Sequence, residues 1–373
     1  MEALILSCST GGGHNAAGYA VKEELERRGH HVTMLDPYCL AGKHLDQVVA
    51  GGYVRIAQKT PHMFGVIYKL GDWYRNLPIH SPVYVVNKPM LKKMRRYLDD
   101  HHYDVILMPH VYPGEILTYM KARNIPIPKL IFIATDYVCT PFTEETDCDY
   151  YIAPAEDLIP DFLRRKIPRE KLLPAGIPVK RGFREQIGRE EALKKLGLDP
   201  SYRYLLLSGG SIGAGKMEKT IRVLKKHLSQ AERLIVICGS HGSLYKKLQK
   251  RYGGDPQILL LTATDQMHLY MKGCDVCMTK PGGLSSTEAA VAGVPLIHIS
   301  PIPGCEISNM KYFSRHGMSI GVGCCLKKLP EALKQLQDPA AREKMIASQR
   351  SGINPHGAEE ICDLAERIVG ETV

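Results

Sequence analysis

The chain has no apolar run longer than a few residues, whereas a membrane-spanning helix needs roughly 20. Its start, Met1 to Leu6, contains no Lys or Arg, so we expect no secretory signal peptide. The 11 cysteines are odd in number and have no framework spacing, which predicts reduced thiols and excludes a disulfide scaffold. Cys274 and Cys277 have C-x-x-C spacing, but no second pair completes a zinc site, and we expect no metal centre.

The composition is that of an ordinary globular protein. Apolar residues make up 44% and charged residues 24%, which excludes a disordered or collagen-like chain. The length of 373 residues indicates two domains at roughly 150 residues each. Lys and Arg exceed Asp and Glu by 49 to 39, and this surplus favours anionic partners such as phosphates, nucleic acid or acidic membrane surfaces.

Short apolar runs alternate with helical patterns along the first half. Ala3–Leu6 reads as a strand that enters the glycine loop Gly11–His14. After the loop Ala17, Val21 and Leu25 share one face of an amphipathic helix. Further strands are predicted at residues 32–35, 105–108 and 130–134, which indicates a parallel α/β sheet.

The stretch 53–98 differs from its surroundings. It carries nine Lys and Arg side chains against one acid, Asp72, with aromatic residues between them. A partner that presents negative charge beside an apolar layer, such as an acidic membrane surface, fits this pattern. A solvated helical face is the other interpretation.

The second half repeats the strand and helix pattern after a Pro/Gly-rich segment at 173–179, which reads as an interdomain linker. Apolar runs at 204–207, 234–237, 258–261, 276–278 and 296–299 have the spacing of βαβ units and predict a second parallel sheet. We expect a helix from Met345 onward. The predicted division is an N-terminal domain at 1–175, a C-terminal domain at 176–355 and a terminal helix at 356–373, for which a return to the N-terminal domain is one option.

The loop Ser208–Gly215 lies between a predicted strand and a helix, where glycines and the helix dipole favour a phosphate. The loop closely matches a Walker A motif, since Gly210 is followed by Gly215 and Lys216. The next residue is Met217, which cannot ligate magnesium as the Ser or Thr of that motif does, so we exclude an ATPase or GTPase. A tight turn without a ligand is the alternative.

Two later loops carry groups that suit a sugar nucleotide. In Thr279–Glu288, backbone N–H groups, two serine hydroxyls and Lys280 suit a diphosphate, and Glu288 is a first-turn carboxylate for sugar hydroxyls. The alternative is a capping box in which Ser285 is the N-cap. In Pro303–Asn309, Glu306 and Asn309 could bracket further hydroxyls, and a solvent-exposed loop is the alternative.

Five motifs follow predicted strands in a fixed order: Gly11–His14, Thr135–Tyr137, Gly209–Ser211, Lys280–Glu288 and Pro303–Asn309. Together they resemble the diacylglycerol glycosyltransferases, the monogalactosyldiacylglycerol synthases of plastids and the processive diacylglycerol glucosyltransferases of Gram-positive bacteria. These are related to the N-acetylglucosaminyltransferase that makes the peptidoglycan lipid precursor. The resemblance covers nearly the whole chain, and its specificity comes from the order of the motifs.

The resemblance implies a GT-B fold, an α/β architecture of two Rossmann-like parallel-sheet domains that face each other across a cleft. It also implies a UDP-sugar held by the C-terminal domain, a lipid acceptor met by the N-terminal domain, inversion at the anomeric carbon and no obligatory metal or cofactor. By position, Glu288 would bind the ribose, Glu306 and Asn309 the donor hexose, and the uracil would lie near Met267. The remaining donor-binding candidates are Gly239 and Ser240 on the base side, with Gly13, Gly209, Ser211, Lys280, Gly282, Gly283, Ser285 and Ser286.

His14 is the expected general base, because it follows the glycines at the end of the first strand and an imidazole with a pKa near about 6.5 can take a hydroxyl proton. Donation to the phosphates is its alternative role. Asp136 is the rival or the assistant, and a turn cap is its alternative. Where the family continues with His-Pro-x-Trp, this chain has Thr140–Thr143, which implies a changed acceptor wall for a different lipid or another amphipathic alcohol.

We therefore expect a cytoplasmic, inverting glycosyltransferase, peripheral at the inner face of the cell membrane, that moves glucose or galactose from a UDP-sugar to diacylglycerol or a glycolipid. The stretch 53–98 would contact the anionic membrane surface. One alternative is a transferase of UDP-N-acetylglucosamine to a polyprenyl-diphosphate lipid. Others are a non-catalytic nucleotide-sugar-binding protein and a nucleic-acid-binding protein, although no nucleic-acid-binding module is recognisable. The sequence does not distinguish glucose from galactose, and it gives neither processivity nor oligomeric state.

Overall fold

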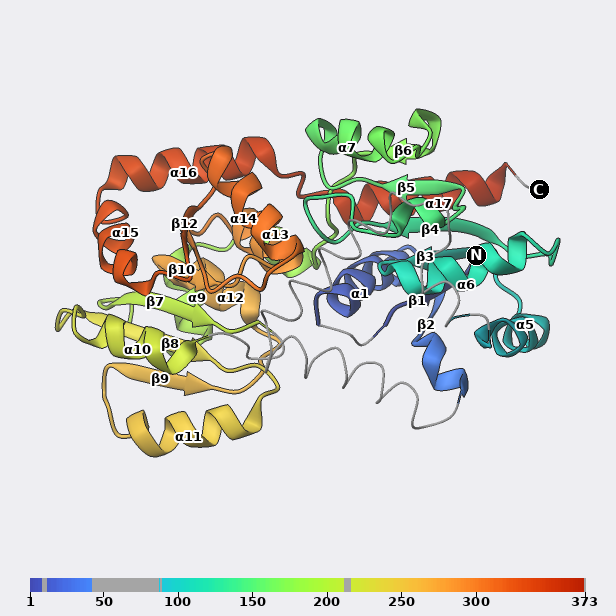
Figure 1. The fold of residues 1–373 in the computed structure, drawn as a ribbon. Coiled ribbons are helices and arrows are strands. Elements are labelled where there is room, and N and C mark those ends of the chain that lie inside the picture. Colours follow the sequence, from blue (N-terminus) through green and yellow to red (C-terminus); the bar gives the residue numbers. More distant parts are fainter. Residues whose placement is uncertain (9–11, 42–86, 88, 211–215, 372–373) are drawn as a thin grey trace. The chain divides into compact units, whose positions relative to one another are not determined.

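The computed structural model describes residues 1–8, 12–41, 87, 89–210 and 216–371 (Figure 1). These form two compact units. The first contains Met1–Arg181, Pro303–Cys305 and Asn354–Val373, and the second contains Gly182–Ile302 and Glu306–Ile353. The segment expected to be a linker, residues 173–179, is instead packed into the first unit, where Ala175 and Ile177 are buried. The first division therefore lies at Arg181 rather than at residue 175.

The first unit is built on a six-stranded sheet of order β2-β1-β3-β4-β5-β6 in which every neighbouring pair is parallel. The strands predicted near residues 3, 32, 105 and 130 are present. β5 and β6 were not predicted, because three and two residues are too few to form a recognisable pattern. The strands are β1 (Glu2–Leu6), β2 (His31–Leu35), β3 (Val105–Met108), β4 (Lys129–Ile133), β5 (Tyr150–Ile152) and β6 (Leu172–Leu173).

Both faces of this sheet are buried. In β1, Leu4 and Leu6 join one hydrophobic cluster, and Ala3 and Ile5 join the cluster on the opposite face. Strand residues alternate between faces, so a strand that is apolar at every position must be covered on both sides. The continuous apolar runs that predicted the strands therefore also explain why helices flank the sheet.

The C-terminal helix α17 (Gly357–Gly370) packs beside α1 (Gly12–Arg27) in the first unit (Figure 1). Arg28 fixes this contact, since its guanidinium donates to Asp363 at 2.6 Å and to Glu366 at 2.9 Å. Burial of Ile361 and Ile368 completes the interface. The other helical elements of this unit are η1 (Pro37–Ala41), α5 (Met90–Asp100), α6 (Val111–Lys121), η2 (Thr143–Glu145), η3 (Glu156–Leu158), α7 (Ile159–Arg164) and η4 (Arg169–Lys171).

The second unit contains another parallel sheet, of order β12-β11-β10-β7-β8-β9. All five predicted strands are present, and β12 was not predicted because its two glycines weaken the strand pattern. The strands are β7 (Arg203–Ser208), β8 (Glu232–Ile237), β9 (Ile258–Leu261), β10 (Val276–Thr279), β11 (Leu296–Ile299) and β12 (Ile320–Gly323).

The helix expected from Met345 onward is two helices in the structure. Met345 lies inside α16 (Pro339–Gly352), and the chain leaves that helix before Pro355, which cannot donate a helical hydrogen bond. The remaining helical elements are α8 (Arg181–Arg184), α9 (Arg189–Lys195), α10 (Met217–Lys225), α11 (Gly242–Tyr252), α12 (Met267–Gly273), α13 (Gly283–Ala292), α14 (Cys305–Arg315), η5 (Leu326–Lys328) and α15 (Leu329–Gln335). Within the described residues, no helix combines the length and the apolar character that crossing a bilayer requires.

Candidate active site

The carboxyl ends of β1, β3 and β4 lie at one edge of the first sheet, because the three strands are parallel neighbours. His14 lies in the first turn of α1, after β1. Its Nδ1 donates to the carbonyl of Pro109, which follows β3, at 2.8 Å. Thr135 follows β4, and its Oγ1 lies 2.9 Å from the same nitrogen. Residues far apart in the sequence therefore hold one imidazole.

These contacts fix which nitrogen of His14 can act as a base. A carbonyl oxygen only accepts, so Nδ1 carries the hydrogen and the neutral ring keeps its lone pair on Nε2. Burial lowers the pKa of His14, and the Pro109 carbonyl opposes this effect only in part. A lowered pKa keeps the ring neutral near pH 7. His14 therefore has the tautomer and the charge state of a general base.

A second imidazole packs against the first. The rings of His14 and His110 have centroids 4.5 Å apart and an edge-to-face geometry at 79°. His110 is the N-cap of α6, where its Nδ1 accepts from the backbone N–H of Tyr112 at 3.2 Å. Burial, together with the neighbouring His14, lowers the pKa of His110 well below its usual range. Two neutral rings can pack in this way without repulsion between charges.

Asp136 follows Thr135 at this edge and is partly exposed. The Thr140–Thr143 segment, where the chain departs from the family pattern, forms a tight turn in which the two threonine hydroxyls lie 2.9 Å apart. Phe142 has φ of 73°, a left-handed conformation that costs a residue with a side chain roughly 1–2 kcal/mol. The altered sequence thus builds a defined turn beside the site.

In the second unit, residues that follow three of the strands meet at the carboxyl edge of the sheet, and one of them, Glu306, lies in the first turn of α14. Lys280 follows β10 and is only 8% exposed. Its Nζ lies 2.7 Å from Oε1 of Glu306, whose Oε2 accepts from the backbone N–H of Ile302 at 2.6 Å. Gly210 follows β7 with φ of 69°, and a Cβ there would lie 3.6 Å from Cε of Lys280. Gly210, Lys280 and Glu306 are therefore brought together.

Helix α13 begins beside this cluster. Its N-cap is Gly282, without a side-chain hydrogen bond, and its first turn contains no acid. The first N–H groups of a helix have no partner within the helix and carry the positive end of its dipole. The start of α13 together with Lys280 therefore favours a diphosphate.

Two predicted local features around α13 need correction, and two further residues have contacts within the fold. Ser285 is not an N-cap, so the capping box is absent, and Glu288 lies in the second turn rather than the first. Ser286 is fully buried, and its hydroxyl lies 2.9 Å from Nε2 of His298 instead of facing a diphosphate. Asn309 is also fully buried, and its Nδ2 donates to the Pro281 carbonyl at 2.9 Å. In the structure as described, Ser286 in α13 and Asn309 in α14 therefore contact groups of the fold.

The other predicted donor residues that the structure describes follow the carboxyl ends of strands. Gly13 is in the first turn of α1, and Gly209 is buried after β7. Gly239 has φ of 64° after β8, with Ser240 exposed beside it, and Met267 begins α12 after β9. Gly283 and Ser285 belong to the first turn of α13. Gly11 and Ser211 lie outside the described residues.

Sequence analysis missed His298, His110 and Glu115. His298 lies in β11, and Ser319 lies 3.1 Å from its Nδ1, so both ring nitrogens are used; burial lowers its pKa to about 3. Glu115 in α6 is fully buried, Asn87 donates to its Oε2 at 2.9 Å, and burial raises its pKa to about 8. The signal for His110 was a polar residue directly after a strand at the edge that carries His14. No comparable signal in the sequence marks His298 or Glu115.

The C-x-x-C pair is not a reactive site in this structure. Cys274 and Cys277 are both buried, and burial raises the pKa of the Cys277 thiol to about 12. A thiol that stays protonated is a poor nucleophile and a poor metal ligand. Within the part of the chain that the structure describes, no three His, Cys, Asp or Glu side chains are grouped as a metal site would need.

Both halves of the chain match known families. Residues 14–179 match the family described as monogalactosyldiacylglycerol (MGDG) synthase, and residues 204–366 match the glycosyltransferase family 28 C-terminal domain. A processive diacylglycerol β-glucosyltransferase of Staphylococcus saprophyticus is 31% identical over 279 residues, which cover 73% of this chain and 69% of that protein. The enzyme of the same name from Staphylococcus epidermidis is 30% identical over 61% of this chain, and the match spans only 58% of its length.

Solved structures with the same fold include two glycosyltransferases. MurG of Acinetobacter baumannii superposes with a TM-score of 0.64 at 14% identity, over 98% of this chain and 99% of that one. WaaG, a glycosyltransferase involved in lipopolysaccharide biosynthesis, gives 0.57 at 16% identity, again over 98% and 99%. The predicted GT-B fold is confirmed. The two family matches and the S. saprophyticus relative together show that this chain belongs to the diacylglycerol glycosyltransferase family.

Proposed function

We propose that this protein is an inverting glycosyltransferase that moves a hexose from a UDP-sugar to the hydroxyl of diacylglycerol or a glycolipid. The observation that carries the proposal is the imidazole of His14, whose Nδ1 hydrogen is held by Pro109 while Nε2 keeps its lone pair. The printed names of the relatives, which are diacylglycerol glucosyltransferases, support the acceptor. A donor site at Lys280 and the start of α13 supports a nucleoside diphosphate.

The reaction exchanges one bond at the anomeric carbon for another. The acceptor oxygen attacks that carbon as the bond to the UDP oxygen breaks, and Nε2 of His14 takes the proton of the acceptor hydroxyl. The departing diphosphate gains charge as the bond breaks. Lys280 and the N–H groups at the start of α13 stabilise that charge, which lowers the barrier. Asp136, next to Thr135, is the second candidate for the base or its assistant.

The function is tested by measuring UDP release from a panel of UDP-sugars with acceptors in anionic mixed micelles. We expect turnover with UDP-glucose or UDP-galactose that requires diacylglycerol or a glycolipid. Turnover confined to UDP-N-acetylglucosamine with a polyprenyl-diphosphate acceptor would identify the alternative transferase. UDP binding without turnover on any acceptor would contradict an enzyme. The same panel distinguishes glucose from galactose.

We expect turnover to be independent of divalent metal ions. Lys280 and the start of α13 supply positive charge where a metal-dependent transferase places a cation. Activity should therefore persist in excess EDTA, measured as UDP release, with a sample returned to excess magnesium as the control. A loss in EDTA that magnesium restores would contradict this prediction.

We propose that the protein is peripheral at the inner face of the cell membrane and contacts it through residues 53–98. The described part of that stretch includes most of α5, in which Met90 and Met94 are buried while Lys92, Lys93 and Arg96 are exposed. Basic residues near an anionic leaflet contribute about 1 kcal/mol each. Residues 53–86 and 88 lie outside the described residues.

Replacing Lys92, Lys93 and Arg96 with Gln should weaken flotation with anionic liposomes by roughly a hundredfold, if each charge acts independently. The matched control replaces the exposed residues Lys246, Lys250 and Lys344 with Gln and should float like the unaltered protein. Neutral liposomes should bind all three proteins equally weakly. Equal loss in the control variant would mean that net charge, and not α5, determines binding.

A further inference from the structure

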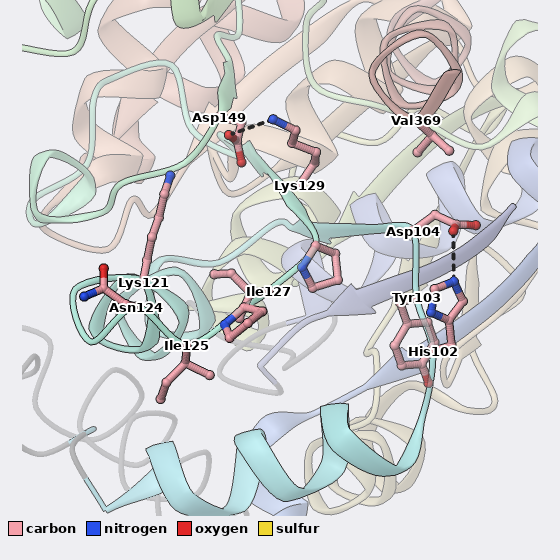
Figure 2. A pocket seen from close by; sticks show the side chains of 12 residues that line it. His102, Tyr103, Asp104, Lys121, Asn124, Ile125, Ile127, Lys129, Asp149 and Val369 are labelled. Carbon is pink, nitrogen blue, oxygen red and sulfur yellow. Dashed lines mark hydrogen bonds and ion pairs between the residues drawn. The ribbon is translucent and has the colours of Figure 1, made fainter. Parts of the chain in front are cut away.

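Two cavities away from the candidate active site differ in how their charges are paired. Figure 2 shows the first, of about 630 Å³, at the amino-terminal edge of the first sheet. Lys129 points to Asp149 at 3.8 Å and His102 points to Asp104 at 3.2 Å. Lys121, which also lines this cavity, pairs with Asp147 outside the lining at 3.2 Å. Its Lys and Asp side chains therefore have partners, and nothing there requires a ligand.

The second cavity, of about 870 Å³, lies on the second unit between α10, the end of α11 and η5. We call it the basic groove. Among the described residues that line it there is no Asp or Glu, and Val223 and Pro330 provide apolar surface. Its basic side chains are Lys219, Arg222, Lys225, Lys226, Arg251 and Lys327.

Four of the six basic residues in this groove form no ion pair in the structure as described. Lys225 pairs with Asp255, and Arg251 pairs with Glu218 at 2.6 Å. In the structure as described, the side chains of the other four make neither an ion pair nor a hydrogen bond: Lys219, Arg222, Lys226 and Lys327. Of these, Arg222 lies near enough to Glu218 to contribute to the lowered pKa of that carboxyl. Like charges gathered on a concave surface repel one another and attract a counter-ion. This groove, unlike the first cavity, is complementary to an anion.

An apolar cleft continues from the basic groove. A neighbouring cavity of about 370 Å³ shares His227 and Pro330 with it and runs between α10 and α15. Leu228 and Leu333 line the cleft and are partly exposed. Polar residues complete its lining: Glu331 and Lys334 are exposed, and Arg203 pairs with Glu232 at 3.3 Å. The basic groove offers positive charge and the cleft beside it offers apolar surface. Together they are complementary to an amphiphilic ligand with an anionic head group.

We propose that the basic groove and its apolar cleft bind an anionic phospholipid. The phosphate would lie against the unpaired basic residues Lys219, Arg222 and Lys226, with Lys327 opposite, and an acyl chain would follow Leu228 and Leu333. A free phosphate would leave the cleft unused. Single-stranded nucleic acid requires exposed aromatic rings for stacking, and Tyr252, the one Tyr, Phe or Trp among the described lining residues of the groove, is buried.

The proposal is tested by calorimetric titration of the full chain with a short-chain phosphatidylglycerol below its micelle concentration, alongside inorganic phosphate and glycerol phosphate. This readout needs neither a sugar nucleotide nor turnover, so it is independent of the proposed transferase activity. We expect the lipid to bind at least tenfold more tightly than either soluble phosphate, because only the lipid buries a chain. Equal affinities for all three ligands would overturn the lipid assignment.

Two variants assign binding to the groove. Changing Lys219, Arg222, Lys226 and Lys327 to Gln should weaken lipid binding by at least about tenfold. The matched control, with Lys246, Lys250, Lys344 and Arg350 changed to Gln, alters net charge equally at exposed positions outside the groove and should bind normally. Equal weakening in both variants would overturn the site.

The apolar cleft has its own variant, Leu333→Asn. It should reduce lipid binding while leaving any weak phosphate binding unchanged, because it alters only the hydrocarbon end of the site. An unchanged lipid affinity would overturn the placement of the chain. Binding of a single-stranded RNA that the lipid does not displace, at higher affinity than the lipid, would show that the groove serves nucleic acid instead.

Discussion

Replacing His14 with Ala is expected to lower kcat for acceptor-dependent UDP release by about 10²- to 10⁴-fold, the usual contribution of a positioned general base. The acceptor hydroxyl must lose its proton as it attacks, and Nε2 of His14 is the nitrogen left with a lone pair when Nδ1 is committed to Pro109. Binding of UDP should change little, because all but one of the donor-binding candidates, Gly13, belong to the second unit. The measurement is steady-state UDP release together with UDP titration.

Asp136→Asn is the companion variant that separates the two candidate bases. If His14 is the base and Asp136 assists, the asparagine variant retains more activity than His14→Ala. A loss of activity in Asp136→Asn that exceeds the loss in His14→Ala would reverse the assignment. His14→Gln is a useful third variant, since a side-chain amide can replace the hydrogen bond to Pro109 without supplying a base.

The pH profile provides a further check of the same residue. Burial lowers the pKa of His14, so the neutral base persists to a lower pH than an ordinary histidine would allow. As the pH falls through that lowered pKa, Nε2 is protonated and activity is lost. The acid limb of kcat/KM should therefore lie below about pH 6.5, the usual histidine value. An acid limb of kcat/KM well above about pH 6.5 would contradict a His14 whose pKa is lowered by burial.

The sequence predicted the sheets and the loops that follow their strands, because buried parallel strands are short continuous apolar runs. Val105–Met108 is an example, with four buried residues in a row. The loops that follow carry glycine where the backbone needs positive φ, as at Gly210 and Gly239. Since parallel strands all end at one edge, strand prediction alone predicted which loops share an edge.

The direction of individual side chains was not predictable in the same way. Ser286 and Asn309 are polar residues within loop motifs, and a ligand contact was the natural interpretation. In the structure each is fully buried and satisfies a group of the fold, His298 for Ser286 and the Pro281 carbonyl for Asn309. Those partners lie 12 and 28 residues away in the chain, beyond what local spacing can indicate.

The contact between Lys280 and Glu306 illustrates the same limit. From the sequence, Lys280 was predicted to bind the diphosphate and Glu306 to bind the hexose. The structure joins them at 2.7 Å, so Glu306 holds the ammonium group in place. Such a carboxylate can position the lysine for a ligand, or release it when a more strongly charged diphosphate arrives. Both possibilities make the two residues energetically coupled.

Lys280→Met is therefore expected to lower kcat by about 10²- to 10³-fold, the cost of removing one charged group that stabilises a transition state. Part of this loss should come from the carboxylate of Glu306, which would then face the diphosphate without a counter-ion. The double variant Lys280→Met with Glu306→Gln removes that repulsion and should bind UDP more tightly than Lys280→Met alone. Lys280→Arg keeps the charge and serves as the conservative comparison, and the exposed Lys344→Met serves as the control. Near-normal kcat in Lys280→Met, within about threefold, would mean that the start of α13 stabilises the departing diphosphate without the lysine.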